Sequence, residues 1–301
     1  MKENDQALLV HVGIPRTSSS TVRRVLREVF TKPLELAEPT SSSYKVLPEN
    51  RVLLLQESIF PVHKKTKRLC RYFTLLRDPV RAVVSEYYWR LTQRHFGTQG
   101  LWTNVSEEAM KFSMSLEEYV AELPRCLNFS ARLIVSSADE AATTHGLPYY
   151  PGNNAFFDDC DEDKLLERVL EIIDKQYAFV GVMELFEEAM FVLANLADID
   201  NLPLWQRTNA SVRPPGWTDA VLPQTLRNRI EESTAVDRKL HGIMAQRFIE
   251  SPEYKAINPE ALQQYKSKCR NLDMENLQKF YRDGLNTWND DAASLKKAFT
   301  D

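Results

Sequence analysis

The sequence predicts an α/β fold with a central parallel sheet, because short apolar runs alternate with helical patterns along the chain. Four runs have the length and composition of buried strands, at residues 7–12, 51–55, 72–76 and 177–182. Apolar residues recur at helical spacing after the first, third and fourth of these runs. Strands that alternate with helices form mostly parallel sheets, so we expect helices on both faces.

The individual elements follow from local patterns. Val22, Val25 and Leu26 begin a helix soon after the first strand, and a second helix is expected from Pro79 to about residue 94. The pair Ser115 and Glu118 has the spacing of a capping box, and residues 163–176 form a strongly amphipathic helix. Residues 31–50 are polar and contain prolines, and are expected to form an irregular connection.

Length and composition set the class of protein. The 301 residues are expected to form one domain over 1–251, with a polar helical extension over 252–301 packed on it. Lys and Arg number 38 against 42 Asp and Glu, which disfavours a nucleic-acid or membrane-surface partner. The four cysteines are scattered and no run approaches 18 apolar residues, so we expect a cytoplasmic protein with reduced thiols and no membrane anchor.

The first junction between strand and helix, HVGIPRTSSSTVRRVL, predicts an anion site. The first N–H groups of a helix are unpaired and carry partial positive charge, to which Arg16 adds a full charge. The alternative is a helix cap beside a solvated Arg16. The signature GxxxxGK[ST] is missing, which disfavours hydrolysis of ATP or GTP. The hydroxyl donors expected to follow phosphate oxygens are Thr17, Ser18, Ser19, Ser20 and Thr21.

A second junction, FTLLRDPVRAVVSEYY, repeats this arrangement. Arg77 ends the strand, Asp78 is a candidate N-cap, Pro79 takes the first helical position, and Ser85 lies on the helix. Parallel strands end at one edge of a sheet, so both junctions should open into the same crevice. Two anion sites in one crevice indicate a ligand with two separated phosphate groups.

PRTSSST and FTLLRDPVRAVVSEYY together resemble the two phosphate-binding motifs of sulfotransferases that use 3′-phosphoadenosine 5′-phosphosulfate (PAPS). The resemblance is strongest to the carbohydrate type related to heparan sulfate 2-O- and 6-O-sulfotransferases, and it implies a P-loop-like fold. Arg77 and Ser85 match the ligands of the 3′-phosphate. Pro15 to Thr21 match the turn that binds the 5′-phosphosulfate, with Arg16 where the family has a lysine that also contacts the leaving oxygen.

Weaker matches imply further site residues. NFSARLI is similar to a helix whose Asn128 and Arg132 would face the active cleft, and RTNASVRP to a loop that would place Ser211 and Arg213 near the cofactor. Tyr88 belongs to an aromatic group that either lines the acceptor cleft or fills core.

Transfer to a hydroxyl also needs a general base. In many relatives a histidine follows the second strand, and Glu57 lies nearest that position here, with His63 six residues on. Glu57 is favoured; the alternatives are a salt bridge for Glu57 and a solvated loop residue for His63. His11, inside the first strand, is expected to be a core residue.

The expected function is transfer of the sulfuryl group of PAPS to a hydroxyl or amine of a small metabolite or saccharide, with 3′-phosphoadenosine 5′-phosphate (PAP) as the product. No metal is expected, because a sulfuryl group carries less charge than a terminal phosphate. The alternatives are a noncatalytic homologue that binds PAP or another nucleotide, and another phosphotransferase on the same fold.

Overall fold

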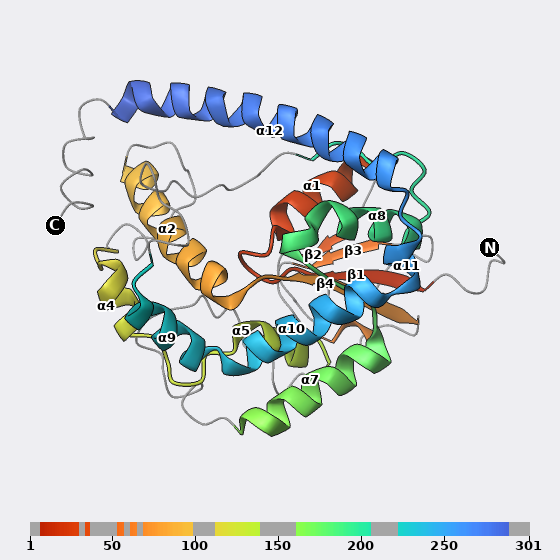
Figure 1. The fold of residues 1–301 in the computed structure, drawn as a ribbon, viewed down its shortest axis with the longest axis horizontal. Coiled ribbons are helices and arrows are strands. Elements are labelled where there is room, and N and C mark those ends of the chain that lie inside the picture. The colour runs from red at the N-terminus through yellow and green to blue at the C-terminus, as the bar shows by residue number, and fades with distance from the viewer. Residues whose placement is uncertain are drawn as a thin grey trace.

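A five-stranded parallel sheet forms the centre of the protein, with helices on both faces (Figure 1). The computed structural model describes residues 7–29, 34–36, 53–56, 61–64, 69–98, 112–138, 161–205 and 222–288. In the order β2-β3-β1-β4-β5, the strands are β1 (Leu8–Val12), β2 (Leu34–Leu36), β3 (Leu53–Gln56), β4 (Cys70–Leu76) and β5 (Tyr177–Val182). The predicted α/β class is confirmed.

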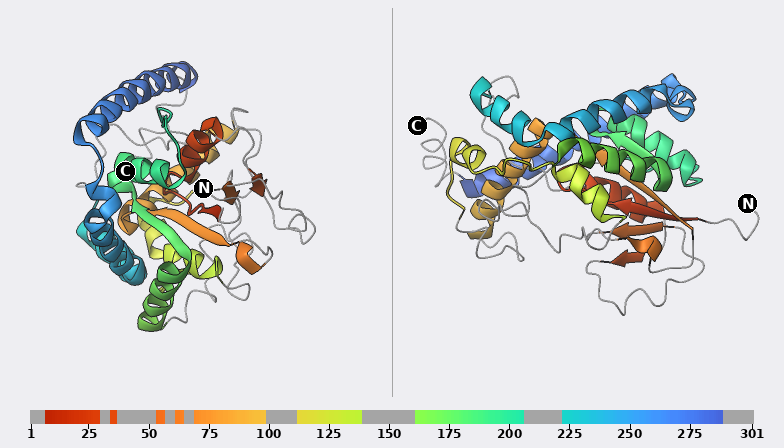
Figure 2. Two further views of the ribbon diagram at one scale, coloured as in Figure 1. Left: turned by 90° about the vertical axis from the view of Figure 1, so that its right-hand side faces the viewer. Right: turned by 90° about the horizontal axis from the view of Figure 1, so that it is seen from below.

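The helices form two layers around the sheet. In Figures 1 and 2, α1 (Ser19–Val29) and α8 (Phe186–Leu196) lie over one face. The opposite face carries α5 (Phe129–Ser136), α7 (Glu162–Gln176) and α10 (Ala235–Glu250). Apolar side chains of these layers close over the buried strands, which is the usual way a parallel sheet is shielded from water.

A second group of helices extends from the carboxyl edge of the sheet. It consists of α2 (Pro79–Thr98), α4 (Leu116–Ala121) and α9 (Gln224–Ser233). These helices share a separate apolar cluster that includes Val83, Tyr87, Tyr119 and Ile230. This cluster fixes the direction in which α2 leaves the sheet. The remaining described elements are two 3₁₀ turns, η1 (Val62–Lys64) and η3 (Met183–Leu185), and two helices near the C-terminus, α11 (Pro252–Lys255) and α12 (Pro259–Trp288).

Within the predicted C-terminal extension, the described residues form α11 and α12, and α12 contacts the domain through α8. The Tyr265 hydroxyl donates to the carbonyl of Pro203 at 2.7 Å, and Lys266 Nζ lies 2.6 Å from Glu188 Oε1. None of the helices in the described part of the chain is both long and apolar enough to cross a membrane.

The local predictions differ from the structure mainly at β2. This three-residue strand lies within 31–50, which was expected to be an irregular connection. It is too short for its sequence to show the alternation of a strand, and it is a strand because it pairs with β3. The capping box of Ser115 and Glu118 is confirmed, with both reciprocal hydrogen bonds present.

His11 is a core residue, as expected. It is buried in β1, and its ring centroid lies 5.0 Å from that of Phe73 on β4. Burial, with a smaller effect of the charge on Arg23, lowers the pKa of His11 to about 3. The folded protein therefore holds this imidazole neutral, whereas the unfolded chain takes up a proton near pH 6.5.

Acid should destabilise the fold through His11. Between pH 6.5 and 3 the unfolded state binds a proton that the folded state does not, so stability falls as pH falls through this window. At pH 4.5 the loss relative to pH 7 is about 2–3 kcal/mol from this group. We expect His11→Leu to lose less stability over this range in urea unfolding. An unchanged pH slope would contradict the neutral, buried state of His11.

Gly181 on β5 is required by close packing. A β-carbon there would lie 2.6 Å from Cζ of Phe179, 2.8 Å from Cδ2 of Leu75 and 2.9 Å from Cβ of Ala189. We expect Gly181→Ala to destabilise the protein by about 1–3 kcal/mol in urea unfolding. Gly242→Ala is the matched control, because a β-carbon added at that position on α10 would meet no atom within 4 Å beyond its chain neighbours and its own helix backbone. It should stabilise by about 0.5–1 kcal/mol, since alanine favours helix.

Candidate functional site

The candidate site lies where β1 and β4 end side by side. After β1 the chain leads to α1 and then to β2, on one side of β1 in the sheet. After β4 it leads to α2 and later to β5, on the other side. The carboxyl edge between β1 and β4 is therefore a topological switch point, the place where open α/β sheets bind ligands.

The turn from β1 into α1 is braced by its own side chains. The hydroxyls of Thr17 and Ser19 both donate to the carbonyl of Ile14, at 2.8 and 2.7 Å. Arg16 has φ 66° and Ser18 has φ 57°, in the left-handed region that non-glycine residues rarely adopt. Two strained residues in one turn ahead of a helix N-terminus are typical of functional loops that point backbone N–H groups at an anion.

This bracing changes part of the prediction for the hydroxyl groups. Thr17 and Ser19 were expected to donate to phosphate oxygens, but their protons are committed to the carbonyl of Ile14. Each hydroxyl has a single proton to donate, so both residues shape the turn in this structure. Pro15, Ser20 and Thr21 flank it, with Thr21 buried in the first turn of α1.

The turn from β4 into α2 follows the prediction closely. Pro79 is the first residue of α2, and Asp78 Oδ1 accepts a hydrogen bond from the N–H of Arg81 at 2.9 Å. Asp78 is therefore the N-cap, as its position before Pro79 indicated. The capped helix carries Ser85 from the end of β4 back toward the β1 turn.

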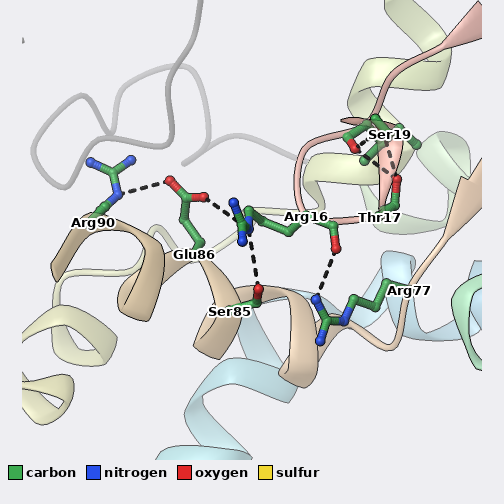
Figure 3. A network of polar contacts seen from close by, with 8 residues as sticks. Arg16, Thr17, Ser19, Arg77, Ser85, Glu86 and Arg90 are labelled. Carbon is green, nitrogen blue, oxygen red and sulfur yellow. Dashed lines mark hydrogen bonds and ion pairs between the residues drawn. The ribbon is translucent and has the colours of Figure 1, made fainter. Parts of the chain in front are cut away.

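The residues of the two motifs meet at this edge (Figure 3). Arg77 Nη1 donates to the backbone carbonyl of Arg16 at 3.0 Å, and Arg16 Nε donates to Oγ of Ser85 at 3.3 Å. These contacts join positions that are 61 and 69 residues apart in the chain. The structure thus brings Arg16, Arg77 and Ser85 into one cluster.

Three further α2 residues belong to this cluster, and two of them, Glu86 and Arg90, were missed from the sequence as site residues. Glu86 Oε2 lies 4.0 Å from Arg16 Nε, and its Oε1 lies 3.0 Å from Arg90 Nε (Figure 3). The guanidinium carbon of Arg16 lies 4.9 Å from the ring centroid of Trp89. The signal was available in the spacing, because Ser85 and Trp89, and likewise Glu86 and Arg90, are four residues apart on α2 and share a helix face.

A second polar contact at the same edge ties β5 and α10 to α2. The N–H of Asp78 donates to Glu184 Oε1 at 3.2 Å, and His241 Nε2 lies 2.9 Å from Glu184 Oε2. Burial disfavours the charge on Glu184, but its contacts with His241 and the Asp78 N–H hold its pKa below the ordinary value. Glu184 therefore fastens the start of α2 to the end of β5.

Asn128, predicted to face the active cleft, is buried in this structure and caps a helix. Asn128 is fully buried, and its Oδ1 accepts hydrogen bonds from the N–H groups of Val236 at 2.9 Å and Asp237 at 3.3 Å. In return, the carboxylate of Asp237 accepts from Ser130 and Ala131 at 2.9 and 2.8 Å. The two residues cap each other's helices, α10 and α5, which explains the polar pattern of this segment.

Arg132 also serves this junction. Its Nη2 donates to the carbonyl of Cys126 at 3.1 Å, just before α5. Its positive charge favours the charged form of Asp237, but burial is the larger effect and raises the pKa of Asp237 to about 6. The contacts of Arg132 thus support helix packing and do not indicate the expected role in binding acceptor.

His63 lies far from the cluster and does not fit the role of general base. Its Nδ1 lies 2.8 Å from the hydroxyl of Tyr72, and its backbone N–H donates to the same hydroxyl at 3.1 Å. Tyr72 is five residues before Arg77 along β4, which separates their Cα atoms by about 16 Å. Burial and the charge on Lys64 lower the pKa of His63. The histidine therefore belongs to the opposite end of the sheet.

Tyr88 is buried in the apolar cluster around α2, with its ring centroid 5.1 Å from that of Tyr87. This burial favours the core alternative over contact with an acceptor. Glu57, Ser211 and Arg213 lie outside the described residues, so their predicted roles stay predictions.

Comparisons with known proteins add no relative to this picture: no family model matches the chain, and no curated protein matches it significantly. The function must therefore be inferred from the residues of the cluster.

Removing the cap at Asn128 should reduce stability and leave anion binding intact. We expect Asn128→Ala to cost about 1–3 kcal/mol in urea unfolding, because two buried N–H groups lose their acceptor. Affinity for PAP, measured by calorimetry on the folded protein, should stay within about twofold of the wild type. Normal stability with lost affinity would instead restore Asn128 to the binding site.

Proposed function

We propose that this protein is a PAPS-dependent sulfotransferase, which transfers a sulfuryl group to a hydroxyl or amine of a small metabolite or saccharide. The single observation that carries the proposal is the meeting of Arg16, Arg77 and Ser85 at the edge between β1 and β4. The resemblance alone assigns Arg16 to the 5′-phosphate of PAP, and Arg77 and Ser85 to the 3′-phosphate. These residues are neighbours in the fold. A ligand with two phosphate groups can therefore contact both motifs at once.

The chemical character of the cluster fits such a ligand. Arg16 and Arg77 supply two permanent positive charges, and α1 directs its N-terminal N–H groups toward the same edge. The strand–turn–helix unit does this without the glycine-lysine signature of nucleotide triphosphatases, so the fold would be P-loop-like rather than a true P-loop. This set of donors favours phosphate and sulfate groups over neutral ligands.

Each residue has a distinct role in the proposed reaction. Arg77 and Ser85 would bind the 3′-phosphate. Arg16 and the turn N–H groups would hold the 5′-phosphate and stabilise the charge that grows on it as the sulfur–oxygen bond breaks. The acceptor oxygen or nitrogen would attack sulfur in line and lose its proton to a base, for which Glu57 is the remaining sequence candidate. We further propose a cytoplasmic setting, in keeping with the buried free thiols of Cys70, Cys126 and Cys269.

Removal of Arg77 tests the 3′-phosphate assignment. We expect Arg77→Ala to weaken PAP binding at least about tenfold in calorimetric titration, because a charge-assisted contact contributes about 1.5–3 kcal/mol. Arg71→Ala is the matched control, since Arg71 is an exposed arginine near the other end of the same strand. The control should bind PAP like the wild type. Equal affinity of the Arg77 variant and the wild type would remove this assignment.

The first experiment on the function itself is titration of the wild-type protein with PAP and with ATP, with magnesium omitted. Micromolar affinity for PAP and much weaker affinity for ATP would support the proposal, and turnover with PAPS could then be screened against acceptors. Preference for ATP would favour another phosphotransferase. Tight PAP binding without turnover on any acceptor would favour a noncatalytic homologue.

A further inference from the structure

Arg16 is surrounded on one side by a single face of α2. Ser85 accepts from its Nε at 3.3 Å, Trp89 lies under the guanidinium at 4.9 Å, and Glu86 lies 4.0 Å from the same Nε. These three residues fall within little more than one helical turn. The side chain of Arg16 is only 15% exposed, so its surroundings restrict its orientation.

A guanidinium can make two of these contacts at the same time. A guanidinium is planar, so it can stack on an aromatic ring while an in-plane N–H donates to a hydroxyl. A lysine ammonium is a compact point charge on a flexible stem and has no group equivalent to Nε. The face formed by Ser85 and Trp89 therefore suits the planar shape of a guanidinium.

Glu86 is held in place from the other side. Its Oε1 lies 3.0 Å from Nε of Arg90, and the side chains of Glu86 and Arg90 are only 14% and 10% exposed. Its distance to Arg16 is longer, at 4.0 Å, so Arg90 is the partner that fixes the carboxylate. Glu86 can then attract the guanidinium of Arg16 without needing to be its hydrogen-bond acceptor.

We propose that Trp89 and Glu86 are positioning residues that orient Arg16 for the phosphate of the ligand and make this site specific for arginine at position 16. The inference rests on the proposed function and deepens it. A guanidinium already held in orientation loses little side-chain freedom when the ligand binds, which strengthens binding without a direct contact. Arg16 therefore takes the place of the family's lysine, and side chains of α2 hold its guanidinium in the orientation that binding needs.

The proposal predicts that lysine cannot replace arginine at position 16 in this chain, although the sulfotransferases that it resembles have lysine there. If charge alone mattered at this position, Arg16→Lys would bind PAP as well as the wild type, since lysine is what the family has there. We expect instead a loss of about tenfold, because a lysine cannot place a planar group over Trp89 while a second N–H donates to Ser85. The variant keeps the positive charge, so the loss of affinity for PAP reports the contribution of the guanidinium's shape and orientation.

A double-mutant cycle tests the positioning role. Trp89→Leu should weaken PAP binding about threefold to fivefold in the wild-type background and less than about twofold in the Arg16→Lys background. Trp89→Phe, which keeps an aromatic face, should recover part of the loss. Tyr87→Leu is the control, because Tyr87 packs on Tyr119 and Phe112 in the second apolar cluster and its effect should be the same in both backgrounds. Glu86→Gln should behave like Trp89→Leu.

The outcomes separate the two proposals. Equal losses from Trp89→Leu in both backgrounds, or none in either, would overturn the positioning role while leaving PAP binding and the proposed function intact. A wild-type protein that binds no PAP would remove the proposed function. The same cycle would then be measured by thermal shift with inorganic phosphate, where coupling between positions 16 and 89 supports positioning and additive effects overturn it.

Discussion

The parallel pairing of β1 with β4 is the constraint on which the candidate site depends. The two strands align from Leu8 opposite Cys70 to His11 opposite Phe73, and the buried hydroxyl of Thr74 donates to the carbonyl of Val12 at 2.7 Å. Because both strands run in the same direction, the turns that follow them leave the sheet at the same edge. The contact from Arg77 to the carbonyl of Arg16 is a consequence of that alignment.

Helix α2 completes the site because its start and its body are both held in place. Asp78 caps its start and is bonded to Glu184, while the apolar cluster of α2, α4 and α9 holds its body. The helix can therefore present Ser85 and Trp89 to Arg16 while Tyr87 packs on Tyr119. Partly buried charges on α2 are paired, as Glu86 is with Arg90, which limits the cost of keeping them out of water.

The junction between α5 and α10 is also formed by partly or fully buried polar residues, but it has a different purpose. Asn128 and Asp237 bond the first N–H groups of each other's helices in a buried setting. Such groups would be costly if left unpaired, so each helix supplies the acceptor that the other lacks. A buried asparagine such as Asn128 can thus hold two helices together instead of binding a ligand, and only its hydrogen-bond partners in the fold distinguish these two roles.

The sequence by itself determined β1, β3, β4 and β5, the helices that begin soon after β1 and β4, and the two junctions. Apolar runs, the Asp78–Pro79 start of α2 and the capping box of Ser115 carry local signals, since strand burial, caps and fixed proline geometry act within a few residues. The short strand β2 was not predicted, because three residues are too few to show the alternation of a strand.

The tertiary structure decided which polar residues act together. The neighbours of Arg16 on α2, the mutual caps of Asn128 and Asp237, and the distance between His63 and Arg77 all follow from packing of segments far apart in the chain. The local sequence specifies on which face of its own helix or strand a side chain lies. Its partners are set by strand order and by the apolar clusters that dock the helices, and these depend on contacts across the whole domain.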